Sequence, residues 1–146
     1  MDDQPRTTEP YPDTNTRSIY LGSSRLAHEH LVAQSQVVLR LGRILMKSGA
    51  SAYRIKASMA RLAKAVGLKE HHAQVTFTEI STSSYTDGNF RTEVAEQRTM
   101  GINAHKLDQL GKFISELPEK ITPAEANAEL DRIDSAKPLY TPWMLA

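Results

Sequence analysis

The stretch LRLGRILMKSGASAYRIKASMARLAKAVGL, residues 39–68, contains two helical patterns separated by a Gly-Ala pair. Apolar residues recur every three or four positions on both sides of this break, which is the spacing of a buried helix face. Gly49 is placed as a C-terminal stop for the first helix, and Ser51 can cap the second helix, which Gly67 ends. The stretch therefore predicts two antiparallel helices joined by a short turn. The apolar spacing of the first helix starts at Leu31, and the helix can begin as early as Leu26.

After residue 68 the apolar spacing changes from helical to alternating. Val75 and Phe77 alternate with threonines, and β-prone residues continue through Ile80–Tyr85. Asp87-Gly88 is a strong hairpin signal before Phe90–Val94. At least two antiparallel strands are predicted.

Two further helices are expected after the hairpin. Asn103 can cap the first of them, and Pro118 stops it. Thr122, Pro123 and Glu125 form a capping box with proline at the first position of the second. A small antiparallel sheet with a hairpin, covered by about four amphipathic helices, buries these faces, so the predicted class is a two-layer α+β fold.

The 146 residues divide by composition into three parts. Residues 1–25 are expected to form a disordered tail, because their prolines and polar residues offer little apolar surface. Residues 26–136 are expected to form one domain. Residues 137–146 contain a base, prolines, Tyr140 and Trp143, and are expected to be a juxtamembrane segment at the start of a missing transmembrane region.

Charge is distributed unevenly along the chain. Residues 31–69 hold eight of the 18 Lys and Arg residues and none of the 17 Asp and Glu residues. Bases three and four positions apart share a helix face, which we expect to face an anionic lipid surface: Arg40, Arg43, Lys47, Arg61 and Lys64. A merely solvated helix face is one alternative. A nucleic-acid reader is another, although Tyr53 is the one aromatic residue of this segment.

Catalytic and metal sites have little support in the sequence. No cysteine is present, and the histidines lack the spacing of a metal site, so no metal, cofactor or catalytic residue is predicted. The pair His71-His72 is expected in a polar, solvated connection. The hairpin is rich in threonine and serine, which favours an exposed sheet face over a ligand site. Glu79, Glu93 and Glu96 are interpreted as surface carboxylates.

Several pieces of the sequence together resemble the N-terminal cytoplasmic domain of the threonine/serine exporter family. They are LRLGRILMKSGASAYRI (39–55), residues 65–68, Asp87-Gly88, RTEVAEQRTMGIN (91–103) and LYTPW (139–143). In that family a multi-helix transmembrane domain follows, and the whole protein is implied to export small polar amino acids or dicarboxylates. The resemblance implies a gating, regulatory or assembly domain at the cytoplasmic face of the plasma (inner) membrane, soluble if expressed alone, with a homo-oligomer left open.

The resemblance also suggests residues of interest. Arg54 and Arg98 are the candidates for contact with an anionic ligand, because a guanidinium can hold a carboxylate with two hydrogen bonds. Tyr53 and Asn103 are further candidates, although Asn103 is better explained as a helix cap. Gly49 and Gly101 are expected to serve backbone geometry.

The sequence also departs from the family pattern. Ser51 and Lys56 stand where relatives often have acids, which disfavours acid–base chemistry on the second helix. The expectation is therefore a non-enzymatic domain. A stand-alone hydrolase-like domain, or a module that binds nucleic acid or another anionic ligand, is the alternative.

Overall fold

Four helices and one three-stranded sheet make up the part of the chain that the computed structural model describes, residues 14–136, with side chains from residue 25 onward. The elements follow in the order α1 (Thr14–Lys47), α2 (Ala52–Ala65), β1 (Glu70–Val75), β2 (Glu79–Thr86), β3 (Asn89–Glu96), α3 (Ala104–Ser115) and α4 (Pro123–Ser135). The predicted α+β class is confirmed.

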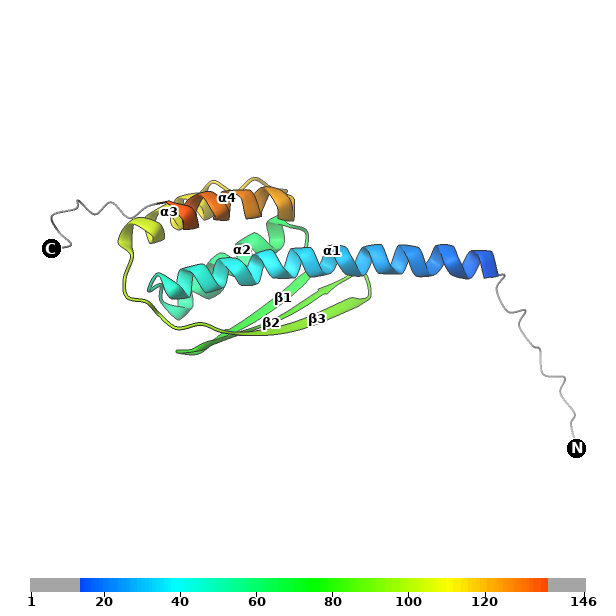
Figure 1. Cartoon of the computed structure of the whole chain (residues 1–146), viewed down its shortest axis with the longest axis horizontal. Helices are drawn as coiled ribbons and strands as arrows, with labels where there is room; N and C mark the ends of the chain where they lie inside the picture. The colour runs from blue at the N-terminus through cyan, green and yellow to red at the C-terminus, as the bar shows by residue number, and fades with distance from the viewer. Residues whose placement is uncertain (1–13, 137–146) are drawn as a thin grey trace, which may run out of the picture.

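The elements are stacked in tiers. Helices α1 and α2 lie side by side on one face of the sheet, and α3 and α4 lie on the far side of this helix pair (Figure 1). Helix α1 contacts α2, β2, β3 and α4. The helices thus form two tiers above the sheet, which refines the expected two-layer arrangement, and the other face of the sheet is uncovered in the described residues.

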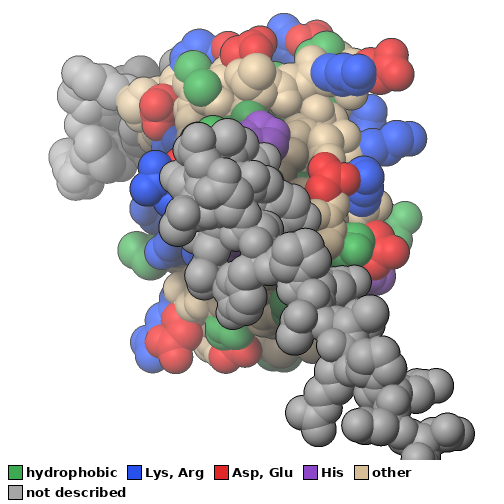
Figure 2. Space-filling view, turned by 90° about the vertical axis from the view of Figure 1, so that its right-hand side faces the viewer, with side chains coloured by type: hydrophobic (Ala, Val, Ile, Leu, Met, Phe, Trp, Pro, Cys, Tyr) green, Lys and Arg blue, Asp and Glu red, His purple; other side chains and the backbone are tan. Residues whose placement is uncertain are grey.

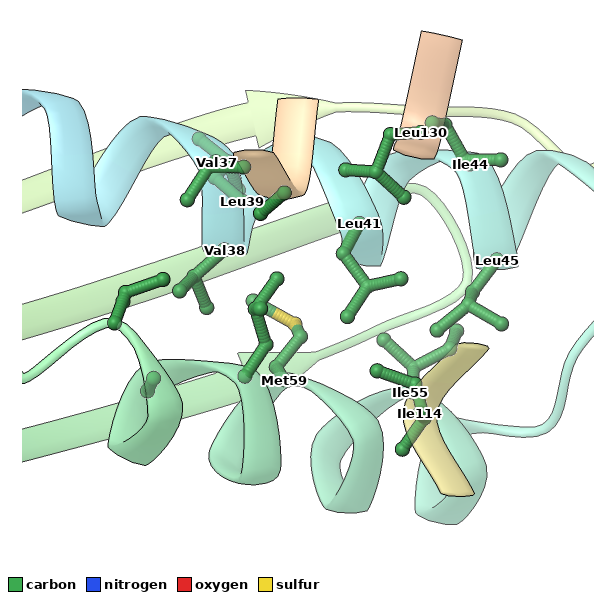
Figure 3. Packing of buried hydrophobic residues seen from close by; sticks show 14 of the residues in the cluster. Val37, Val38, Leu39, Leu41, Ile44, Leu45, Ile55, Met59, Ile114 and Leu130 are labelled. Carbon is green, nitrogen blue, oxygen red and sulfur yellow. The ribbon is translucent and has the colours of Figure 1, made fainter. Parts of the chain in front are cut away.

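The core lies between the two helices of the hairpin. Leu41 and Leu45 of α1 point toward Ile55 and Met59 of α2, with Leu130 of α4 close by (Figure 3). These five side chains are at most 1% exposed. Burying a side chain of this size contributes about 1.5–3 kcal/mol, so this cluster is a principal source of stability.

The predicted helix caps are confirmed. The Ser51 hydroxyl accepts a hydrogen bond from Arg54 N at 3.2 Å, and Asn103 Oδ1 accepts one from Lys106 N at 3.0 Å. Thr122 Oγ1 accepts a hydrogen bond from Glu125 N at 3.1 Å. These side chains satisfy backbone donors that the first turn of a helix leaves free.

The sheet is an antiparallel meander in the order β1-β2-β3. The predicted hairpin turn at Asp87-Gly88 joins β2 to β3, and both residues have positive φ, 45° and 81°. The Asp87 carboxylate accepts a hydrogen bond from Lys69 Nζ at 2.5 Å, which ties the turn to the segment before β1 and raises the pKa of Lys69.

The start of helix α1 differs from the prediction. Helix α1 begins at Thr14 rather than near Leu26, because the segment after the prolines contains no further proline and extends the helix that the core nucleates. The other expectations for residues 1–13 and 137–146 fall outside the described residues.

The first strand also lies earlier than expected. His71-His72 is part of β1 instead of a connection, and Phe77 lies in the turn between β1 and β2, where it is 95% exposed. The turn is closed by a hydrogen bond from Thr76 N to Glu79 O at 2.9 Å. Strand β1 was hard to recognise because the face that it turns toward the helices carries His71 and Ala73, and Val75 is the one large apolar residue on it.

The end of α1 is joined to the segment between β3 and α3. Met100 N donates to Lys47 O, and Asn103 N donates to Ser48 O, each at 3.0 Å. Gly49 has a φ of +92°, and a Cβ atom there would lie 2.9 Å from Gly101 O. The two sequence pieces around Gly49 and Gly101 therefore form one structural junction.

Replacing Gly49 by alanine should destabilise the fold strongly. The positive φ costs about 1–2 kcal/mol for a residue with a Cβ, and overpacking against Gly101 adds about 1–3 kcal/mol. Gly88→Ala is the matched control, since Gly88 has a φ of +81° but no atom within 4 Å of an added Cβ. Urea unfolding should show the larger loss for Gly49→Ala, and equal losses would contradict the steric role of the junction.

Candidate functional site

The candidate ligand residues lie at one end of the molecule, where α1 ends, α2 begins and β3 leads into α3. Arg54 is half-buried, and its Nη2 donates a hydrogen bond to Leu107 O of α3 at 2.6 Å. A Cβ added at Gly111 would lie 2.9 Å from the same nitrogen, so α3 approaches the guanidinium closely. Arg54 therefore joins α2 to α3, and its remaining N–H groups are the ones that a ligand could use.

The other three candidates are arranged differently around this end. Tyr53 is 85% exposed on the first turn of α2, and Arg98 is exposed in the segment after β3. Asn103 already uses its side chain and its backbone N–H in hydrogen bonds: the side chain caps α3, and the N–H donates to Ser48 O. The capping interpretation of Asn103 is confirmed, and the ligand role of the other residues stays a prediction.

A hollow of about 310 Å³ lies beside these residues. Its lining carries no charged side chain and comes from the start of α2, the turn after β1 and the segment after β3: Met46, Ala50, Ser51, Ala52, Ile55, Val75, Thr76, Phe77 and Thr99. The hollow suits apolar groups rather than the charged groups of an amino acid. Sequence reasoning missed Phe77, because its alternation with threonines suggested a strand position.

The bases of the two helices do not all point into solvent. Arg40 Nη1 donates to Asn127 Oδ1 at 2.9 Å, and its Nη2 pairs with Asp131 Oδ1 at 2.6 Å. Arg40 thus holds α4 against α1. Arg43 lines a groove with Glu93 between α1 and β3, whereas Lys64 lines a separate hollow near residues 119–124. Arg43, Lys47, Arg61 and Lys64 are exposed.

The inner face of the sheet is unusually polar. Thr82 and Ser84 are each 1% exposed and Thr86 is 8% exposed, so these hydroxyls are covered by the helices, contrary to the expected exposed face. The reason is that alternate strand residues point to opposite faces, which sends half of the hydroxyls inward. His71 lies opposite Ser84 in the register and is itself half-buried.

Burial lowers the pKa of His71 from its ordinary value of 6.5 to about 4, with a smaller contribution from the charge of neighbouring His72. Taking an imidazolium out of water disfavours the charged form. His71 is therefore neutral in the folded protein at physiological pH.

The three acids of the hairpin separate into two environments. Glu93 lies on the inner face and pairs with Arg91, while Glu79 and Glu96 lie opposite each other on the exposed face. Among the described residues no group of three or more histidines, aspartates or glutamates is placed to hold a metal ion. Neither arrangement brings a carboxylate to the apolar hollow.

The pKa of His71 makes the stability of the fold depend on pH. The unfolded chain binds a proton at His71 as the pH falls below 6.5, whereas the folded chain does so only near 4. Protonation therefore favours the unfolded state, and the free energy of unfolding should fall as the pH drops through this interval. His71→Gln should flatten this fall, as measured by urea unfolding across the interval. His105→Gln, at an exposed position on α3, is the control and should keep the wild-type slope; an unchanged slope in His71→Gln would contradict the assignment.

Comparison with known proteins places this fold in a family. No helix within residues 14–136 combines the length and apolar character needed to cross a membrane. A similar protein is pheromone-regulated membrane protein 10 of Candida glabrata, which is 27% identical over 117 residues. The match covers 78% of this chain and 15% of that protein. No solved structure matches the chain. The profile of the ThrE family, described as "Putative threonine/serine exporter", matches residues 36–146. The chain therefore belongs to the threonine/serine exporter family, a family of membrane transport proteins.

Proposed function

We propose that this chain is the soluble N-terminal domain of a threonine/serine exporter-type transporter and acts as a gating, regulatory or assembly module. The family match carries this proposal, because it includes the last third of α1, residues 36–47, and every later element of the fold. The described elements form a hydrophobic core of their own. A domain that folds separately from an attached membrane domain needs such a core. The partner would be the membrane domain of the exporter, at the cytoplasmic face of the plasma membrane.

The proposed role is not enzymatic. A hydrolase using the hairpin would need an accessible nucleophile beside a base, and Thr82 and Ser84 are instead covered by the helices. On the outer face, the hydroxyls of Ser83 and Thr92 form a hydrogen bond with each other, at 3.2 Å. Glu93 is paired with Arg91. The chain belongs to a transport family, and the inward hydroxyls of its sheet are covered. Both observations favour a domain that binds a ligand over one that catalyses a reaction.

The ligand proposed for this domain is the exported solute, a small polar amino acid or a dicarboxylate. Arg98 offers an exposed guanidinium, and Arg54 offers its free N–H groups at the same end of the fold. Both can bind a carboxylate through paired hydrogen bonds. Binding of the solute to Arg54 would link solute concentration to the position of α3, because Arg54 also donates a hydrogen bond to Leu107 O.

The first experiment is to read the gene beyond the codon for Ala146, and the neighbouring gene, for about ten apolar segments long enough to span a bilayer. Such segments are expected, and they would supply the membrane domain for an export assay. If neither gene encodes them, the transporter role fails and a stand-alone binding or hydrolytic role replaces it.

The ligand role of the arginines can be tested in that complete transporter. Arg98→Ala is expected to lower export of labelled threonine, serine or a dicarboxylate about tenfold, because one charge-assisted contact is lost. The melting temperature of the domain should not change, since Arg98 is exposed. Arg54→Ala should lower both export and the melting temperature, because the bond to Leu107 O is also lost.

Arg61→Ala is the matched control for this experiment, because Arg61 is an exposed base on α2 beyond the site. It should leave export and melting temperature unchanged. Wild-type export by both Arg54→Ala and Arg98→Ala would show that these arginines do not contact the solute.

A further inference from the structure

Four large apolar side chains are exposed at the end of the molecule that carries the junction. Tyr53 is 85% exposed, Phe77 95%, Met100 74% and Ile102 79%. They belong to three segments far apart in the sequence. We refer to these four residues as the apolar end.

Several contacts bring these segments together. The hollow joins Ala52 of α2 to Phe77 and to Thr99, the residue before Met100. A Cβ added at Gly49 would lie 3.1 Å from the Ile102 side chain, and Met100 N is bonded to Lys47 O. The four side chains therefore project from one end of the fold rather than being scattered over its surface.

Exposed apolar residues gathered at loop tips and a helix start are unusual for a protein that stands alone in water. Figure 2 shows the opposite end, where Lys, Arg, Asp and Glu side chains alternate with a few hydrophobic ones around the surface that is not hidden by grey residues. The gathering of four such side chains around one hollow indicates that the apolar end has an occupant.

The direction of the chain indicates what the occupant is. Exposed bases lie around the apolar end at Lys47, Lys56 and Arg98, and two exposed acids, Glu79 and Glu96, lie at the same end of the sheet. Helix α4 finishes at the same end of the molecule, since Asp134 shares a hollow with Lys47 and Gln97 (Figure 1). The chain continues from there into a sequence with Lys137, Tyr140 and Trp143.

We propose that the apolar end docks onto the lipid bilayer, with Tyr53, Phe77, Met100 and Ile102 entering the interface and the flanking bases contacting lipid phosphates. Aromatic and aliphatic side chains next to bases are the combination that binds to a bilayer interface. This assigns the membrane contact to one end of the fold rather than to the flanks of α1 and α2. The proposal rests on the membrane-transport role proposed above.

Vesicle binding of the full 146-residue chain tests the proposal. The probe is phosphatidylcholine with about one third phosphatidylglycerol, and binding is measured by cosedimentation. The double variant Phe77→Ser with Ile102→Ser is expected to lower the partition coefficient at least about tenfold, because two apolar anchors are removed. The wild-type chain should bind pure phosphatidylcholine vesicles about fivefold more weakly, because these vesicles lack the anionic lipids that pair with the bases.

The exposed face of the sheet supplies a matched control. Phe90 and Val94 are 65% and 60% exposed and lie away from the junction. Phe90→Ser with Val94→Ser likewise replaces one exposed aromatic and one exposed β-branched side chain, and it should leave partitioning within about twofold of wild type. Equal losses in the two double variants, or no binding of the wild-type chain, would overturn the proposal and favour a protein partner.

A second measurement locates the contact directly. Trp143 is the one tryptophan of the chain, so Trp143→Phe gives a background for single-tryptophan variants. In the Trp143→Phe background, brominated lipid should quench the tryptophan fluorescence of Phe77→Trp and should not quench that of Phe90→Trp. Quenching of both or of neither would overturn the proposal. The outcome is independent of export: a transporter that exports normally while its apolar end fails to bind vesicles would refute the docking alone.

Discussion

The carbonyl groups at the end of α1 need hydrogen-bond donors, and the segment between β3 and α3 supplies those of Lys47 and of Ser48, the next residue. Met100 N and Asn103 N bond to Lys47 O and Ser48 O, and the side chain of Asn103 then caps α3. One short segment thus ends one helix and starts another, which fixes the second helical tier on the first. Gly49 makes this possible, since its positive φ turns the chain and its missing Cβ leaves room for Gly101. The fold, the candidate arginines and the apolar end all depend on this junction.

The helices were predictable from the sequence because each carries both an apolar period and a capping residue. Ser51, Asn103 and Thr122 all act as the caps that their positions predicted. The sheet was less predictable, since the inward face of strand β1 carries His71 and Ala73 before Val75 and so shows little of the apolar alternation of a buried strand. The burial of Thr82 and Ser84 was not predictable for the same reason. The sequence does not distinguish a polar residue at an inward strand position from one at an outward position.

The candidate site was predictable only in part. The sequence drew attention to Arg54 and Arg98 through their neighbouring motifs, and the structure places both at the junction end. It did not reveal that Arg54 holds Leu107 O, because that contact joins residues 53 positions apart. Arg40 similarly looked like a surface base until α4 was found beside it, with Asp131 as its partner. Exposure of Phe77 and Ile102 depends on which loops converge, and a linear pattern carries no such information.

Helix α1 has a mechanical consequence for the molecule. It contacts the other helix of its tier, two strands of the sheet and helix α4, so it connects every tier of the fold. At 34 residues it is about 51 Å long, and among its side chains described from residue 25 onward the first buried one is Leu31. Packed interiors resist gradual deformation. A pull on the projecting half of α1 would therefore be transmitted as a single load to the sheet and to α4, and the helix acts as a lever arm for the whole domain.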